Sequence, residues 1–244
     1  MSNRNGSSNV TRNLFVQVVQ TSFKLYLLLT LSYNVYIMDI KFYIAKNTSN
    51  TWSNKHELLL NYVSDNRKEK INRYIFENDK ITSLYAAILT RLGIVKHFNC
   101  NNSELIFDKT KTGKPILKFI GKTSLNNVDF NFSHTKTAVL LGIVFEKNYA
   151  IGVDIECLKK APFDIMPMVF HPLEIDFVNS FHGDMKNQAF FEIWTKKEAY
   201  TKCIGTGLVN NPCSINTLSA SLNDTIYTWQ YEDHICSACV LYTP

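Results

Sequence analysis

The segment Gly152-Val-Asp-Ile-Glu156 limits the possible folds of this chain more than any other. It belongs to an apolar run from Ala150 to Ile155 that is typical of a buried β-strand. Residues i and i+2 of a strand point to the same face, so Asp154 and Glu156 lie side by side. Two neighbouring carboxylates are costly unless a cation neutralises them or one binds a proton. The segment therefore predicts a strand at a cation site. The alternative is one carboxylate at the exposed end of the strand, paired with a lysine.

A second segment predicts a helix, from Lys186 to Ile204, with charge at the end of an apolar face. Aromatic residues would anchor this face in the core, and an acid and two lysines would emerge where it ends. Mg²⁺ in proteins binds carboxylates together with substrate phosphates, so this end fits a metal–phosphate site. The alternative is an ordinary Glu–Lys pair on the helix surface. The residues spaced by four along the face are Phe190, Trp194, Glu198 and Lys202, with Lys197 beside them.

Length and composition exclude several classes of protein. The chain has 244 residues, of which 45% are hydrophobic and 19% charged, as in ordinary globular proteins. This excludes a disordered, collagen-like or small disulfide-stapled chain, and the length allows one large domain or two small ones. The net charge of +5 is too small and too scattered for a nucleic-acid binder, but it suits an anionic ligand or an acidic partner protein.

The six cysteines have no framework spacing, which favours a reducing compartment and a cytoplasmic protein. One pair, Cys236-Ser-Ala-Cys239, has metal-like spacing and lies near His234. A structural zinc site needs four ligands, and the sequence has no second pair to complete it. We therefore expect these cysteines to be buried small residues of a strand at the end of the chain.

Helices and strands interleave without the regular spacing of βαβ units, which predicts a mixed α+β fold. A proline at 172 fits the first turn of a further helix, and glycines at 205 and 207 fit the end of the long one. Helices are expected at 57–62, after Ser64, at 79–95 and at 186–204, and strands at 38–45, 105–107, 116–119, 128–132, 137–145, 150–155, 225–231 and 235–242.

Residues 1–37 form an N-terminal extension, and we expect Met38 to be the true start because an alternating, strand-like pattern begins there. The dense apolar run from Leu25 to Leu31 is too short to span a membrane. The alternative for this region is an amphipathic helix that lies on a membrane surface.

Three further features carry weaker signals. Asn131-Phe-Ser-His134 ends an apolar strand, and its histidine would donate to a phosphate or serve a structural role. Gly113-Lys-Pro115 is a tight turn with one basic side chain. A run of basic residues forms either a binding face or an ordinary solvated one; its members are Arg67, Lys68, Lys70 and Arg73.

These features, in this order, resemble the 4′-phosphopantetheinyl transferases of the Sfp type. The family has an x-D-x-E strand followed by W-x-x-K-E-[AS] and K-x-x-G-x-G-L. This chain matches all three with Gly152-Val-Asp-Ile-Glu156, Trp194-Thr-Lys-Lys-Glu-Ala199 and Lys202-Cys-Ile-Gly-Thr-Gly-Leu208. Gly113-Lys-Pro115, Asn131-Phe-Ser-His134 and Phe170-His-Pro-Leu-Glu174 match weaker family positions, and the resemblance covers about residues 38–244.

The resemblance implies a pseudo-dimer of two similar α+β halves, at 38–148 and 149–244, with coenzyme A in the cleft between them. It implies an enzyme of the holo-[acyl-carrier-protein] synthase type. Such an enzyme moves the 4′-phosphopantetheine arm of coenzyme A onto a serine of an apo acyl or peptidyl carrier protein and releases adenosine 3′,5′-bisphosphate. It also implies dependence on Mg²⁺, with Mn²⁺ as a substitute, and a monomer that serves fatty-acid, polyketide or nonribosomal-peptide synthesis.

The resemblance also assigns roles to residues. Asp154, Glu156 and Glu198 correspond to the metal-binding acids, and Asp154, Glu198 and Lys202 to the catalytic residues. Lys197 and Lys202 correspond to lysines beside the pyrophosphate. Glu198 is the first candidate for the base that takes the serine proton, directly or through water; a metal-bound water is the alternative. The remaining coenzyme A contacts would be Arg67, Lys70, Ser83, Gly113, Lys114, Pro115, Ser133 and His134.

The chain departs from the family pattern in its first half. Thr82 stands where many relatives have arginine, and Ala86-Ala87 replaces a Gly-Asp/Glu pair. These departures affect the first-half coenzyme contacts and leave the acidic centre intact. Two other functions remain open: a non-catalytic member of the fold that binds coenzyme A or a carrier, and a metal-dependent phosphohydrolase that needs no carrier.

Overall fold

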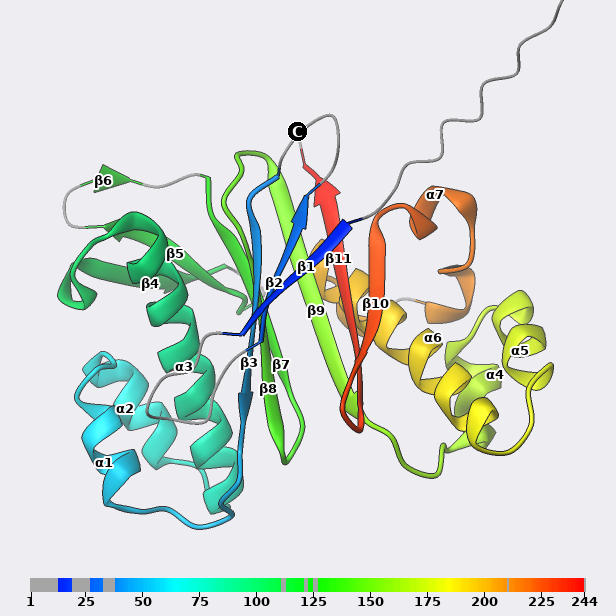
Figure 1. The fold of residues 1–244 in the computed structure, drawn as a ribbon, viewed down its shortest axis with the longest axis horizontal. Coiled ribbons are helices and arrows are strands. Elements are labelled where there is room, and N and C mark those ends of the chain that lie inside the picture. Colours follow the sequence, from blue (N-terminus) through cyan, green and yellow to red (C-terminus); the bar gives the residue numbers. More distant parts are fainter. Residues whose placement is uncertain are drawn as a thin grey trace, which may run out of the picture.

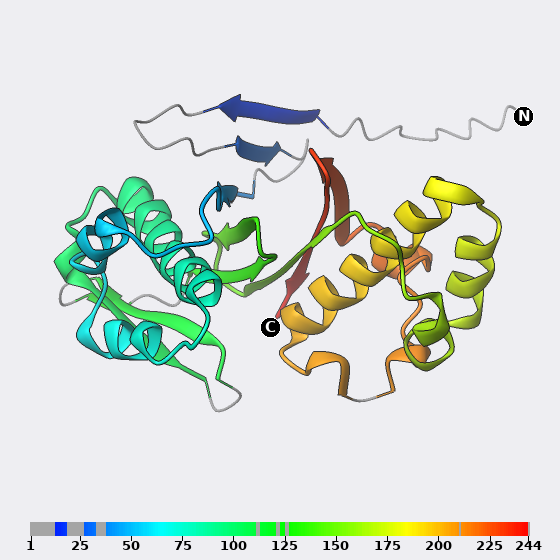
Figure 2. The same ribbon diagram turned by 90° about the horizontal axis from the view of Figure 1, so that it is seen from below.

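The computed structural model describes residues 13–18, 27–32, 38–110, 113–120, 123–124, 127–209 and 211–243. Helices lie on the two outer sides, and two β-sheets meet in the middle (Figures 1 and 2). Residues 38–148 are called the first half and residues 149–244 the second half. The mixed α+β class expected from the sequence is confirmed.

The first half contributes β3, β8 and β7 to an antiparallel sheet in the order β1-β2-β3-β8-β7, whose strands β1 and β2 belong to the segment before residue 38. The strand β8 is buried along its whole length because both of its faces are covered. The long helix α3 covers one face with Ala86, Leu89 and Ile94. A second small sheet, in the order β4-β5-β6, lies beside it. The strands are β1 (Asn13–Val18), β2 (Leu27–Ser32), β3 (Ile40–Lys46), β4 (Leu105–Lys109), β5 (Pro115–Ile120), β6 (Thr123–Ser124), β7 (Asp129–His134) and β8 (Ala138–Val144), and the helices are α1 (Asn54–Leu60), α2 (Asp65–Asn72) and α3 (Glu77–Phe98).

The second half has a three-stranded antiparallel sheet, β10-β11-β9, with the long helix α6 packed against it. Gly152 of β9 permits this packing, because a Cβ atom there would lie 2.1 Å from the carbonyl oxygen of Ala199 on α6. The helix α6 ends at Gly205, whose φ of +75° is the left-handed conformation common after helix ends. The elements are β9 (Tyr149–Cys157), α4 (Met166–Val169), α5 (Pro172–Asn179), α6 (Gly183–Ile204), α7 (Ala220–Asn223), β10 (Ile226–Tyr231) and β11 (His234–Tyr242).

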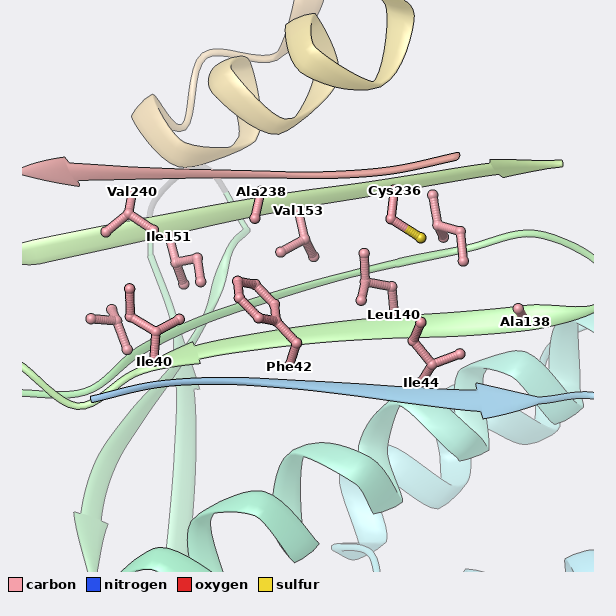
Figure 3. Packing of buried hydrophobic residues seen from close by; sticks show 12 residues of the cluster. Ile40, Phe42, Ile44, Ala138, Leu140, Ile151, Val153, Cys236, Ala238 and Val240 are labelled. Atoms are coloured by element: carbon pink, nitrogen blue, oxygen red, sulfur yellow. The ribbon is translucent and has the colours of Figure 1, made fainter. Parts of the chain in front are cut away.

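The inner faces of the two sheets pack against each other and form the core that joins the halves (Figure 3). Ile40, Phe42 and Ile44 of β3 point toward Val153 of β9 and Ala238 of β11. The layers therefore run α3, first sheet, second sheet, α6. Side chains at i and i+2 of each strand share this core, and the residues between them face the helices.

The expected helices and strands of residues 38–243 are confirmed, with ends that differ by a few residues. Pro172 occupies the first turn of α5, as expected. In the extension at 1–37, the described parts are the strands β1 and β2, so the alternative of an amphipathic helix is wrong there. The expectations for the rest of that segment lie outside the described residues, and a start at Met38 stays a prediction. None of the helices that the structure describes could cross a membrane.

Candidate active site

Asp154 lies at the centre of a cluster to which both halves contribute. Its side chain is on β9, and the residue is only 3% exposed. Its Oδ1 accepts a hydrogen bond from Ser133 Oγ of β7 at 2.8 Å and another from Lys202 Nζ of α6 at 2.6 Å. Its Oδ2 is buried and has no hydrogen-bond partner among the described residues. Ser133, Asp154 and Lys202, which the sequence singled out separately, therefore lie together in the structure.

Two more carboxylates stand near Asp154. Glu198 Oε2 lies 3.9 Å from Lys202 Nζ, one helical turn away on α6. Burial raises the pKa of Glu198, Lys202 opposes this, and Asp154 raises it further. Burial also raises the pKa of Glu156, with Asp154 as the second cause. Asp154 raises the pKa of both Glu156 and Glu198, because the three carboxylates lie near one another, and Lys202 offsets part of this effect.

The donor set of this cluster suits a hard divalent cation. Within the described ranges, no three His, Cys, Asp or Glu side chains converge closely enough to hold a metal ion as they stand. However, Asp154 Oδ2 is buried and has no hydrogen-bond partner in the described part of the chain. Burial also disfavours the ionised form of Glu156 and of Glu198, and a bound cation would stabilise that form. Carboxylate oxygens are the ligands that Mg²⁺ prefers, so these three residues fit such an ion in type and charge.

His134 directly follows Ser133 at the end of β7. Partial burial lowers the pKa of its imidazole, and the charge of Lys202 lowers it further, whereas Asp79 and Asp154 raise it. Ser133 points toward Asp154, so the side chain of His134 lies on the opposite face of β7. The structure gives no hydrogen bond or ion pair between this ring and Lys202 or Asp154 among the described residues, so a role for His134 at an anion stays a prediction.

Lys197 does not belong to this cluster, and the prediction that it lies beside the pyrophosphate is wrong. It is 1% exposed and points into the second half. Its ammonium group lies 2.8 Å from Glu174 Oε2 and donates to the carbonyl oxygens of Pro212 at 2.9 Å and Ile215 at 2.5 Å. An ammonium group has three donors, and all of them are used. Lys197 therefore ties the loop after α6 to α5.

The turn at Gly113-Lys-Pro115 has a structural task as well. Gly113 has a φ of +87°, and its N–H donates to the carbonyl oxygen of Thr110, which closes the turn. Lys114 Nζ lies 2.6 Å from Asp129 Oδ2 and 3.4 Å from the carbonyl oxygen of Ile151. The lysine thus joins the first half to β9, and its charge is already paired. A role for Lys114 as a free phosphate ligand has no support in this arrangement.

The remaining first-half candidates form a separate group. Arg67 donates to the carbonyl oxygen of Ser83 at 2.9 Å and to its Oγ at 3.1 Å. Arg67 Nε is buried with no partner in the described part of the chain, and the guanidinium lines a pocket of about 90 Å³ together with Pro115. Lys70 is exposed on α2. The structure brings Arg67, Ser83 and Pro115 near one another but gives no contact from them to Asp154.

Sequence reasoning missed the role of two residues on β7. Asp129 Oδ2 accepts the N–H of Ile151 at 2.8 Å, and Asn131 Oδ1 accepts the N–H of Val153 at 3.1 Å. These side chains hold β7 beside β9, where the two strands have no backbone ladder. The signal was the alternation of Asp129, Asn131 and Ser133 at every second position, which places all three on one face.

The cysteine pair behaves as expected. Cys236 lies in the core between the sheets, whereas Cys239 packs with Cys203 on the side of α6. Residues three apart in a strand face opposite sides, so this pair cannot chelate one ion. All six cysteines lie among the described residues, and none of them forms a disulfide.

Comparison with known proteins connects this geometry to one family. Residues 150–240 match the model of the 4′-phosphopantetheinyl transferase superfamily, and residues 49–144 match the model of the N-terminal part of 4′-phosphopantetheinyl transferases. The two matches adjoin one another and together cover more than half of the chain.

Individual relatives agree with these matches. The chain is 29% identical to the 4′-phosphopantetheinyl transferase gsp of Aneurinibacillus migulanus, over 74% of this chain and 77% of that protein. It is 31% identical to the 4′-phosphopantetheinyl transferase ffp of Bacillus subtilis, over 62% of this chain and 63% of that protein. It is 29% identical to the L-aminoadipate-semialdehyde dehydrogenase-phosphopantetheinyl transferase of Schizosaccharomyces pombe, over 67% of each. The chain belongs to the 4′-phosphopantetheinyl transferase superfamily.

Proposed function

We propose that this protein transfers the 4′-phosphopantetheine group of coenzyme A to a serine hydroxyl of an apo acyl or peptidyl carrier protein. The observation that carries the proposal is the contact of Ser133 and Lys202 with Asp154, where β7, β9 and α6 meet. This cluster contains an ammonium group, a serine hydroxyl and a buried carboxylate, with two further carboxylates near them, at the junction of the halves. Those are the groups that a phosphoryl-type transfer between two hydroxyl compounds requires.

In the proposed reaction, the serine oxygen of the carrier forms a bond to the β-phosphorus of coenzyme A. The bond from that phosphorus to the bridging oxygen breaks, and adenosine 3′,5′-bisphosphate leaves with the electron pair. Lys202 binds the pyrophosphate and stabilises the charge that develops on it. His134 donates to a phosphate oxygen from the end of β7. The residues Arg67, Lys70, Ser83, Gly113 and Pro115 remain proposed contacts for the rest of coenzyme A.

Glu198 is the proposed acceptor of the serine proton, directly or through one water. Burial raises the pKa of its carboxyl in the metal-free protein, whereas a bound Mg²⁺ would lower it again. The proposal predicts an acid limb in the dependence of kcat on pH, because protonated Glu198 cannot act as a base. The Glu198→Gln variant should have a low kcat, and this kcat should not fall further as the pH is lowered.

Asp154, Glu156 and Glu198 would hold Mg²⁺, or Mn²⁺ in its place. Bound there, the ion would neutralise the pyrophosphate oxygens. Asp154 has a buried oxygen for this task, Oδ2, which has no hydrogen-bond partner among the described residues. The metal requirement is part of the proposal and is tested with the reaction.

The decisive experiment is intact-protein mass spectrometry of an apo acyl carrier protein and an apo peptidyl carrier protein. Each is incubated with this protein, coenzyme A and Mg²⁺. We expect the carrier to gain the mass of one phosphopantetheine group and to lose this gain with EDTA. A carrier whose acceptor serine is replaced by alanine is the matched control.

Other outcomes would contradict the proposal in distinguishable ways. Coenzyme A bound without transfer to any carrier would indicate a non-catalytic binder. Coenzyme A cleaved in the absence of a carrier would indicate a phosphohydrolase. We further propose that the protein is a cytoplasmic monomer, because its six cysteines are free and its two halves already pair with each other.

A further inference from the structure

The turn between β7 and β8 directly follows Ser133 and His134. The N–H of Thr135 donates to the carbonyl oxygen of Ala138 at 2.8 Å. The Oγ1 of Thr135 accepts the N–H of Thr137 at 3.2 Å and that of Ala138 at 3.1 Å. Thr135 therefore closes the turn on itself, and any contact that moves this turn also moves the end of β7.

The first half holds one side of this turn. The N–H of Asn47 donates to the carbonyl oxygen of Thr137 at 2.7 Å. The carbonyl oxygen of Lys136 accepts Asn78 Nδ2 at 3.0 Å and Asn47 Nδ2 at 3.3 Å. These contacts come from the end of β3 and the first turn of α3, so they fix the turn relative to its own half only.

The second half reaches the same turn through His234 of β11. This residue is 1% exposed, and its Nε2 lies 2.9 Å from Thr137 Oγ1 and 3.2 Å from Thr135 Oγ1. Its Nδ1 lies 2.8 Å from Asp233 Oδ1, a close ionic contact that is not aligned as a hydrogen bond. With the proton on Nδ1 beside this carboxylate, the single lone pair of Nε2 accepts the nearer hydroxyl, that of Thr137.

We propose that His234 is a positioning residue for the coenzyme A site. It fixes the turn 135–137 to the second half, and the end of β7 is fixed with it. Ser133 and His134 then keep their position relative to Asp154, which the second half carries. His234 touches neither the proposed substrates nor the acidic cluster, so it acts only through the two threonines. The inference rests on the proposed function, since it concerns the same coenzyme A site.

The test compares steady-state transfer by the full chain and its variants, with coenzyme A and an apo carrier varied separately. Loss of one buried hydrogen-bonding anchor should raise the KM for coenzyme A about fivefold in His234→Ala, with kcat changed by less than about twofold. His234→Gln keeps a hydrogen-bonding group at this position and should recover most of the loss. Thr137→Val removes the shorter of the two threonine contacts from an exposed residue and should reproduce most of the effect of His234→Ala even if the buried variant folds poorly.

Glu232→Gln is the matched control. Glu232 follows β10 and pairs with Lys46 of β3, so it also joins the halves near this place without touching the turn. Its KM for coenzyme A should equal that of the wild type. The inference is overturned if Thr137→Val and His234→Ala leave this KM unchanged, or if Glu232→Gln raises it as much as they do. If the wild type itself transfers nothing and binds no coenzyme A, the proposed function has failed instead, and the inference fails with it.

Discussion

The ammonium group of Lys202 lies 2.6 Å from Asp154 Oδ1 and 3.9 Å from Glu198 Oε2. One lysine of α6 therefore serves two carboxylates, and only one of the two contacts is close enough for a hydrogen bond. Asp154, Glu156 and Glu198 lie around this one lysine, so the cluster has more acidic than basic side chains. This imbalance governs the first three predictions.

Asp154→Asn should reduce transfer by about 10²-fold or more, because it removes the charge around which Ser133 and Lys202 are arranged. The amide keeps the shape of the side chain, so the fold should persist. Initial rates from mass spectrometry and a circular dichroism melting curve measure the two effects. Asp108→Asn, at an exposed ion pair with Lys118, is the control and should change neither. Near-normal transfer by a folded Asp154→Asn protein would remove this residue from the site.

Mg²⁺ should raise the Tm of the wild-type protein but not that of Asp154→Asn. A ligand that binds only the folded state stabilises it, by about 2.7 kcal/mol at a concentration 100 times its Kd. Thermal shifts with increasing MgCl₂ measure this, and equal ionic strength from NaCl controls for screening. Equal shifts in both proteins would show that the ion binds elsewhere.

Glu198→Gln should be more stable than the wild type in EDTA at neutral pH. The pKa of Glu198 is raised from its ordinary value of 4.5, so the folded state binds its proton more tightly than the unfolded state does. The free energy of unfolding therefore falls as pH rises through the window between 4.5 and the raised value. The advantage of the variant should vanish below that window.

Melting curves of both proteins between pH 5 and 8 test this prediction. Glu69→Gln on the exposed surface of α2 is the control and should melt like the wild type throughout. A stability gain in Glu198→Gln that does not depend on pH would contradict the assignment to this carboxyl.

Lys197→Met should destabilise the fold by about 3–5 kcal/mol, because it leaves Glu174 charged and unpaired in the interior. The double variant Lys197→Met/Glu174→Gln should be more stable than the single one. Urea unfolding measures both. Lys202→Met, on the same helix, should instead lower kcat while costing less stability, because its side chain is 28% exposed. Equal losses of stability in Lys197→Met and Lys202→Met would contradict this division between structure and catalysis.

Gly152→Ala should lower both stability and activity. The added Cβ would lie 2.1 Å from the carbonyl oxygen of Ala199 and 2.3 Å from the amide nitrogen of Cys203, so α6 must move away from β9. Overpacking of this kind costs about 1–3 kcal/mol. It also shifts Glu198 and Lys202 relative to Asp154. Gly183→Ala meets no atom within 4 Å and should keep full activity, although its φ of +57° makes the backbone less favourable.

Much of this arrangement could be read from the sequence because it follows local periodicity. The i,i+2 spacing of Asp154 and Glu156 and the i,i+4 spacing of Glu198 and Lys202 are properties of one strand and one helix. That this strand and this helix lie near Ser133 could be expected only from the family resemblance, because the periodicity of one segment does not determine which strands pack together.

Lys197 shows where such reasoning fails. It adjoins Glu198 in the sequence and carries the right charge, yet neighbouring residues on a helix point about 100° apart. The side chain accordingly faces Glu174, which lies 23 positions earlier in the chain. Its three partners come from α5 and from the loop after α6, and their positions depend on tertiary packing that no short segment encodes.

The seam between β7 and β9 has a consequence for how the two halves stay in register. A backbone ladder can slide by two residues and keep its hydrogen bonds, whereas the side chains of β7 that reach β9 differ from one another: a carboxylate and an amide that accept, and a hydroxyl that donates. A slip by one would offer phenylalanine side chains to β9, and a slip by two would bring the wrong polar group to Asp154. Asp129, Asn131 and Ser133, at alternate positions of β7, therefore permit only one register between β7 and β9, and this register fixes the alignment of the two halves.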